Sequence, residues 1–276
     1  MKLVMTLLVR DEQDIVRENL DFHLAQGVDL VIVTDNGSED ATTEILREYE
    51  SRGVVRLLFE TSDDYSQGRW VTRMARLAAD EGADWVINND ADEFWWPRTG
   101  SLKSGFEQLG AEVGLVVARR VNFVPRPEDG RPFWERMTLR ERESLNPLGK
   151  PLPPKLAHRA DPEIVVAQGN HKVEGAQLGE RLDDGSIEIL HFPMRTYSQF
   201  ENKIVKGGRA YARNRELPQR TGRTWRRLYE TWEQGGLRDH YDQNVVEAAP
   251  GAELLEDARL RDFLRDLRAG LAADDR

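Results

Sequence analysis

The chain has 276 residues, 32% of them charged, and a formal net charge of -10 at pH 7. This length is enough to bury a substantial core, and the acidic balance argues against the phosphate backbone of a nucleic acid as the main partner. The sequence holds no cysteine, which excludes disulfides, thiolate zinc sites and a cysteine nucleophile, and is compatible with a cytoplasmic protein.

The first 90 residues alternate between two kinds of pattern. Residues 3–9 are apolar and give way to charge at Arg10, which predicts a strand and no signal peptide. No apolar run approaches the roughly 18 residues of a membrane span, so no transmembrane segment is expected. Three more strands are predicted at residues 28–35, 54–60 and 83–90, with helices between the strands at 11–27, 38–53 and 65–82. This alternation predicts an α/β fold whose mostly parallel sheet carries helices on both faces.

The second half is less regular. A strand is predicted at 113–124 and another ending at His191, followed by a basic helix at 198–214. Residues 125–169 are rich in Pro, Arg and Glu without a clear period and predict a loop-rich insertion on the acceptor side. The tail from residue 251 predicts an amphipathic helix, which permits a dimer. We therefore expect one domain over 1–215 and a helical appendage over 216–276.

Acidic residues follow each of the first four predicted strands. The strand ends read "VRDE", "VTDNGSED", "FETSDD" and "NNDADE". Carboxyl ends of parallel strands share one edge of a sheet, where ligands of such folds bind. Asp90 and Asp92 stand two apart, so on an extended segment both side chains point the same way. Carboxylates suit Mg²⁺ or Mn²⁺, whose remaining positions are filled by water and phosphate. The cluster thus predicts a metal that carries a nucleoside diphosphate.

Three stretches in this order carry a family resemblance: "VRDEQDIVRENLDFH", "VIVTDNGSEDATTEIL" and "DWVINNDADEF". Together they resemble the amino-terminal half of family-2 glycosyltransferases of the GT-A fold, in the branch whose Asp-x-Asp motif reads "DADEF". The likeness covers residues 1–97 and is weaker in "NHKV" and "LHFPMRTYSQFENKIVKGG". It implies a transferase that uses a nucleoside-diphosphate sugar, UDP favoured, with Mn²⁺ or Mg²⁺, and a saccharide or small-molecule acceptor.

The resemblance also implies roles for residues in the first half. Asp35 would receive the base or ribose, Asp90 the ribose or metal shell, and Asp92 the metal as its principal ligand. The residues expected to line the nucleotide pocket besides these are Val9, Arg10, Glu12, Asp63 or Asp64, and Arg73.

The second half must complete the site. His191, at the end of a predicted strand, is expected to join Asp92 and Asp90 on the metal, with His171 as its competitor. The diphosphate is expected to meet Lys203, within a positive set that also holds Lys172, Arg195 and Lys206.

The catalytic base is harder to place, because the late "ED" signature of many family-2 enzymes is absent. Glu174 is the candidate beside Asp92 in the catalytic set, with Asp183 and Asp184 as alternatives. Two other functions stay open: a nucleotidyltransferase, although no Gly-rich phosphate loop follows the first strand, and a non-catalytic nucleotide-sugar-binding protein.

Overall fold

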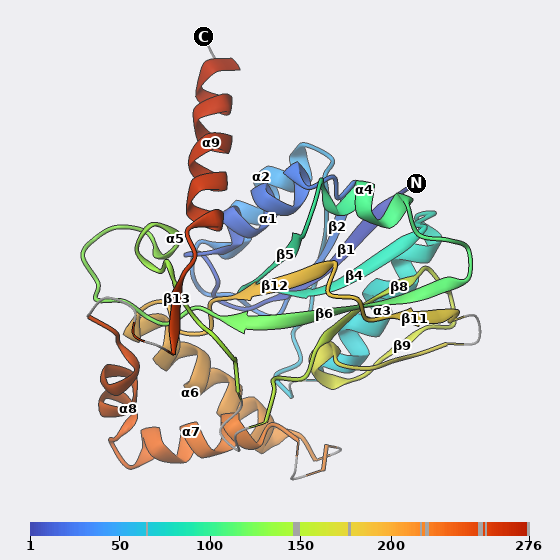
Figure 1. Cartoon of the computed structure of the whole chain (residues 1–276). Coiled ribbons are helices and arrows are strands. Elements are labelled where there is room, and N and C mark those ends of the chain that lie inside the picture. The colour runs from blue at the N-terminus through green and yellow to red at the C-terminus, as the bar shows by residue number, and fades with distance from the viewer. Residues whose placement is uncertain are drawn as a thin grey trace.

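Strands and helices alternate through the first third of the chain, as the sequence predicts (Figure 1). The computed structural model describes residues 1–64, 66–145, 150–175, 178–215, 217–218, 221–247, 251 and 253–274. The first elements are β1 (Leu3–Val9), α1 (Val16–Ala25), β2 (Leu30–Asp35), α2 (Thr42–Ser51), β3 (Val55–Phe59), α3 (Gln67–Asp80) and β4 (Trp85–Asp90).

The remaining elements are shorter until the carboxyl-terminal helices. They are β5 (Glu93–Pro97), α4 (Leu102–Glu107), β6 (Val113–Asn122), α5 (Phe133–Arg136), β7 (Leu139–Glu141), β8 (Lys155–Arg159), β9 (Val165–Val166), η1 (Gln168–Asn170), β10 (Val173–Glu174), β11 (Glu180–Leu182), β12 (Ile187–His191), α6 (Tyr197–Arg213), α7 (Arg223–Glu233), α8 (Leu237–Asn244), β13 (Leu254–Glu256) and α9 (Arg259–Asp274).

One sheet organises the molecule. Its strand order is β3-β2-β1-β4-β8-β6-β12-β5, with β11 paired to β6. The pairs among β3, β2, β1 and β4 are parallel, as are those of β6 with β11 and β12. Strand β8 is antiparallel to both its neighbours, and β5 is antiparallel to β12. The mostly parallel α/β sheet predicted from the sequence is confirmed.

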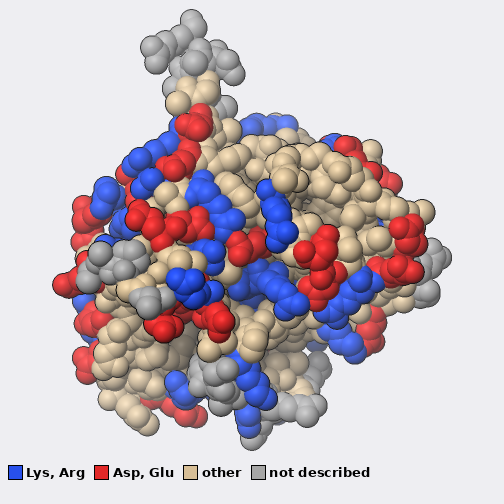
Figure 2. Space-filling view, viewed as in Figure 1, with Lys and Arg blue, Asp and Glu red and all other residues tan. Residues whose placement is uncertain are grey.

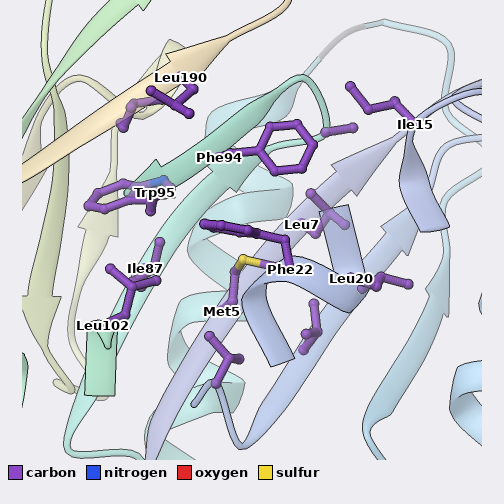
Figure 3. Packing of buried hydrophobic residues seen from close by; sticks show 14 of the residues in the cluster. Met5, Leu7, Ile15, Leu20, Phe22, Ile87, Phe94, Trp95, Leu102 and Leu190 are labelled. Carbon is purple, nitrogen blue, oxygen red and sulfur yellow. The ribbon is translucent and has the colours of Figure 1, made fainter. Parts of the chain in front are cut away.

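Alternation of side chains along the strands separates two cores. Leu3, Met5 and Leu7 of β1 pack in one cluster with α1, α2 and α9, whereas Val4 packs in another with α3. The first cluster is aromatic at its centre: Figure 3 shows Phe22 of α1 beside Met5 and Leu7 of β1, with Phe94 of β5 close by. Helices therefore cover both faces of the sheet because successive strand residues face opposite sides.

Several short strands differ from the sequence prediction, and two of them are placed by distant partners. Residues 155–159, expected to lie in a loop-rich insertion, form β8 in the middle of the sheet. Residues 254–256, expected to open a helix, form β13 and pair with β7, and α9 begins only at Arg259. Both segments are short, and tertiary pairing rather than local period places them.

A third cluster joins α6, α7 and α8 at the lower left of Figure 1. Phe200 and Ile204 of α6 meet Leu228 of α7, and Leu237 and Tyr241 of α8 close the group. The cluster fixes α6 where the strands β6 and β12 end. Within the described ranges, each helix is too short or too polar to cross a bilayer.

Candidate active site

The acids expected at the strand ends lie at one edge of the sheet, but Asp90 and Asp92 do not share an extended segment. Strand β4 ends at Asp90, and Ala91 and Asp92 form a turn before β5 begins. The expectation that both carboxylates project together from one strand is therefore wrong. The turn gives each of them its own set of partners.

The Asp90 carboxylate has three protein donors and stays 29% exposed. Its Oδ1 atom accepts hydrogen bonds from Gln67 Nε2 at 3.3 Å and Asn170 Nδ2 at 3.0 Å, and its Oδ2 atom pairs with Lys155 Nζ. Lys155 is 1% exposed and also faces Glu93 Oε1 at 3.5 Å. Burial raises the pKa of Glu93 to about 7 against the opposing charge of Lys155. This arrangement does not support Asp90 as a metal ligand.

Asp92 and His191 form a separate pair. Asp92 Oδ2 lies 3.7 Å from His191 Nε2, beyond a hydrogen bond, and both side chains are largely buried. His191 Nδ1 lies 2.7 Å from Asn122 Oδ1, while the Asn122 amide nitrogen donates to Glu141. Asn122 Oδ1 thus accepts a hydrogen bond from His191 Nδ1–H, and the lone pair of Nε2 faces Asp92. Histidines that bind a metal through Nε2 are oriented in this way.

Lys203 of α6 also reaches Asp92. Its Nζ atom pairs with the same Oδ2 atom that faces His191. Burial by itself would raise the pKa of Asp92, but the charge of Lys203 above all, with smaller contributions from His191 and Arg195, outweighs it and holds that pKa well below its usual value. Burial lowers the pKa of Lys203, and the charges of Asp92 and Glu12 more than reverse this, so Lys203 stays protonated.

The end of β1 contributes a buried ion network. Arg195, which is fully buried, donates to Glu12 Oε2 at 2.5 Å and to both Asp14 oxygens at 2.7 and 2.8 Å. Burial raises the pKa of Glu12 to about 7, opposed by the charges of Arg195 and Lys203. The Asp92 charge acts on Glu12 as well, so Glu12 belongs to the same edge. Val9, 2% exposed, packs in the core.

The base-side residues are held in local contacts. Arg10 pairs with Asp63 at 2.6 Å, which ties the ends of β1 and β3 together. Asp35 accepts from Ser38 N and from Thr43 Oγ1 and so shapes the turn after β2. Asp64 accepts from Ser66 N at 3.1 Å at the start of α3. Arg10, Asp35 and Asp64 therefore lie at the ends of β1, β2 and β3 as expected.

The edge also holds a strained residue. Asp11 has φ 54°, a conformation that non-glycine residues adopt rarely. Its carboxylate accepts from the Glu39 backbone at 2.7 Å and from Asn202 and Lys206 of α6. A polar cleft of about 360 Å³ opens beside it, between the loops after β1 and β2 and the start of α6. Figure 2 shows basic side chains among acidic ones on one face of the molecule.

Two expected residues lie elsewhere. Arg73 faces out of α3, 3.4 Å from Glu60, and lines a different cleft of about 560 Å³ along α3 and β9. Glu174, expected as the catalytic base, stands exposed on β10 and pairs with Lys172 at 2.5 Å. These positions do not support the expected roles of Arg73 and Glu174.

The alternatives to these residues are also placed. Asp183 pairs with Arg119 at the surface. His171 Nδ1 lies 3.0 Å from Pro154 O, and burial together with Lys155 lowers its pKa to about 4. His171 thus lies on the Asp90 side of the site, whereas His191 lies on the Asp92 side. Within the residues that the structure describes, no three His, Asp or Glu side chains gather as a complete metal cluster.

Sequence reasoning missed three residues that orient the site: Lys155, Asn170 and Asn122. Asn170 has φ 60° and is fully buried, with its Nδ2 on Asp90. Asn122 sits opposite His191 in the register of β6 and β12. The sequence predicts that a strand ends at His191, which indicates a neighbouring strand. It does not indicate which residue of that strand lies opposite His191, because this depends on the register of β6 and β12.

Comparison with known proteins places the chain in a family. None of the curated proteins matches it. Among solved structures, TarS of S. aureus in complex with UDP-GlcNAc has a TM-score of 0.47 at 14% identity, over 87% of this chain and 74% of that one. Glucosyl-3-phosphoglycerate synthase of Mycobacterium tuberculosis, with Mn²⁺, UDP and glucosyl-3-phosphoglycerate, has a TM-score of 0.31 at 19% identity, over 43% and 44%. At this level of similarity neither structure assigns a ligand to the chain.

The family model gives the assignment. The model of glycosyl transferase family 2 matches residues 7–155, more than half of the chain, and the match begins in β1 and ends at Lys155. It spans the four strands whose ends carry the acids, on the α/β sheet expected for the GT-A fold. The chain belongs to glycosyl transferase family 2.

Proposed function

We propose that this glycosyltransferase uses a divalent cation, Mn²⁺ or Mg²⁺, and a nucleoside-diphosphate sugar, with UDP as the favoured nucleotide, to glycosylate a saccharide or small-molecule hydroxyl. The observation that carries the proposal is the Asp92–His191 pair. A carboxylate oxygen and an oriented imidazole nitrogen face each other there, beside a protonated lysine. This donor set fits a cation that keeps water and phosphate in its other positions.

Each group has a task in the transfer. A bound cation would supply positive charge for the departing diphosphate. Asp92 and His191 would hold the cation, and Lys203, which pairs with Asp92, would donate to the diphosphate oxygens. Asn122 orients His191 for this role. Asp90, fixed by Lys155, Gln67 and Asn170, is free of the metal and remains available to the ribose.

Glu12 replaces Glu174 as the proposed base for the acceptor hydroxyl. Its pKa of about 7 matches the pH at which a general base works best. It precedes Gln13 and follows Asp11, both of which line the polar cleft of about 360 Å³.

Calorimetric titration with UDP and then GDP, each with Mn²⁺ and with chelator, tests the proposal. We expect metal-dependent binding of UDP. Asp92→Asn should weaken it by at least about 100-fold, since loss of a direct ligand exceeds loss of an orienting partner. Asp29→Asn, a carboxylate paired with Lys103 before β2, should bind like wild type. A folded wild-type protein that binds neither nucleotide would contradict the proposal.

A further inference from the structure

Helix α6 lies across the acidic edge and pairs with the strand-end acids one after another. Lys203 meets Asp92 after β4, Lys206 and Asn202 meet Asp11 after β1, and Arg213 meets Asp63 after β3. The cartoon shows α6 beside the ends of β6 and β12 (Figure 1). The helix therefore supplies counter-charges to the edge at which a nucleotide would bind.

The contact of Lys203 has a special geometry. Its ammonium pairs with Asp92 Oδ2, and His191 Nε2 faces that same oxygen from 3.7 Å. A cation held between Asp92 and His191 would need the oxygen that Lys203 holds. Both positive charges at one carboxylate oxygen would repel each other, so Lys203 and a metal compete for Asp92.

A diphosphate offers Lys203 another partner. Lys203 and Lys206 are three residues apart on α6 and thus neighbours on its surface. Their side chains are 24% and 20% exposed, so both can be reached from solvent. When Lys203 leaves Asp92 it loses an anionic partner. An incoming diphosphate supplies another.

We propose that Lys203 makes the binding of metal and of nucleoside diphosphate mutually dependent. In the free protein it neutralises Asp92 and opposes metal binding. When the diphosphate binds, Lys203 transfers to it and releases Asp92 for the metal. The inference rests on the proposed function and adds to it a reciprocal coupling between two ligands, which must be equal in both directions.

The test measures Mn²⁺ affinity with and without saturating UDP, by calorimetry and by the electron paramagnetic resonance signal of free Mn²⁺. In the wild type we expect Mn²⁺ to bind at least about tenfold more tightly with UDP present. In Lys203→Met, Mn²⁺ alone should bind several-fold more tightly than in the wild type, UDP should bind more weakly, and the coupling should shrink. Direct contact between the metal and the diphosphate would also couple the two ligands. That contact cannot explain tighter binding of Mn²⁺ to Lys203→Met than to the wild type when no UDP is present.

Two variants control the experiment. Lys203→Arg keeps the charge and should keep the low affinity for Mn²⁺ alone. Lys103→Met removes a Lys–Asp pair of similar exposure, 29%, beside Asp29, and should behave as wild type. Unchanged or weaker binding of Mn²⁺ alone in folded Lys203→Met overturns the inference, as does independent binding of the two ligands to the wild type. A wild type that binds no nucleoside diphosphate overturns the proposed function itself.

Discussion

Lys155 neutralises two of the three acids in the segment Asp90–Glu93. It is 1% exposed and pairs with Asp90 and with the fully buried Glu93. Removing one partner of a buried ion pair costs about 3 to 5 kcal/mol, because the other charge is left unpaired. We expect Lys155→Met to lower the free energy of unfolding by about this amount in chemical denaturation.

The double variant Lys155→Met/Glu93→Gln separates charge from packing. It also removes the Glu93 carboxylate, which in Lys155→Met keeps only Arg120, 3.4 Å away, as a cationic partner, so part of the lost stability should return. A double variant no more stable than Lys155→Met would show that the lysine acts through the shape of its aliphatic stem instead.

Glu12 gives a second prediction at this scale, for activity. Glu12→Gln should lower kcat by about 100-fold or more, the usual size of a general-base contribution, and change UDP–Mn²⁺ affinity much less. In the wild type kcat/KM should rise with pH through about 7, since the base must be ionised and burial raises its pKa to that value. Glu174→Gln, at an exposed ion pair, is the matched control. Equal losses in both variants would remove Glu12 from the mechanism.

Single residues were predictable where the local pattern fixed their place. Asp35, Asp90 and Asp92 end or follow strands with clear apolar runs, so the edge could be located from the sequence. Lys155 could not, because it opens a five-residue strand inside an irregular segment, and the antiparallel pairing with β4 and β6 alone turns it toward Asp90.

At the scale of elements, the contact between α6 and α7 depends on two adjacent glycines. A Cβ added at Gly208 would lie 2.5 Å from Tyr229 Cβ, and one at Gly207 would lie 2.4 Å from the Trp225 ring. The absence of side chains there lets α7 approach the helix that carries Lys203.

Gly208→Ala therefore has two opposing effects on stability: overpacking against Tyr229 destabilises the protein, and the higher helix propensity of alanine stabilises α6. Overpacking costs about 1 to 3 kcal/mol, and the gain in propensity is about 1 kcal/mol. We expect a net loss of stability in thermal unfolding and weaker UDP–Mn²⁺ binding as α6 shifts. Gly105→Ala, in α4 with open space around the new Cβ, should be stabilising. A stabilised Gly208→Ala would mean that α7 moves aside freely.

Elements with a long apolar or amphipathic period were predicted, including β1 to β4, β6, β12 and α6. The strands β8 and β13 were not, because their three to five residues carry too little period to outweigh the surrounding Pro, Arg and Glu. Their partners lie far away along the chain, so pairing decides their structure.

For the whole molecule, two buried histidines predict sensitivity to acid. His23 donates from Nδ1 to Asn19 O and accepts from Trp95 N, and His158 donates to Arg159 O. Burial lowers the pKa of each to about 4. The unfolded chain takes up protons near pH 6.5 and the folded one only near 4, so stability falls as pH drops between these values.

The raised pKa values of Glu12 and Glu93 make stability rise as pH falls, opposite to the effect of the histidines. A variant that lacks both histidines therefore isolates their contribution. Relative to His23→Gln/His158→Gln, the wild type should lose about 2 kcal/mol per histidine between pH 7 and pH 5. Denaturant unfolding across this range measures it. If the difference in the free energy of unfolding between the two proteins does not change with pH, the histidines have the same charge in the folded and the unfolded state.

The place of β8 in the sheet also has a consequence for biosynthesis. Lys155 is 65 residues beyond Asp90, Lys206 is 195 beyond Asp11, and Arg268 of α9 pairs with Glu18, 250 residues before it. Contacts so distant in sequence slow folding and leave early segments waiting for late ones. On the ribosome, one edge of β4 stays unpaired until residues 155–159 have emerged. Until then Asp90 also lacks Lys155, the side chain that neutralises it. The acidic edge is therefore completed late in translation, and release of a shorter chain exposes a strand edge open to aggregation.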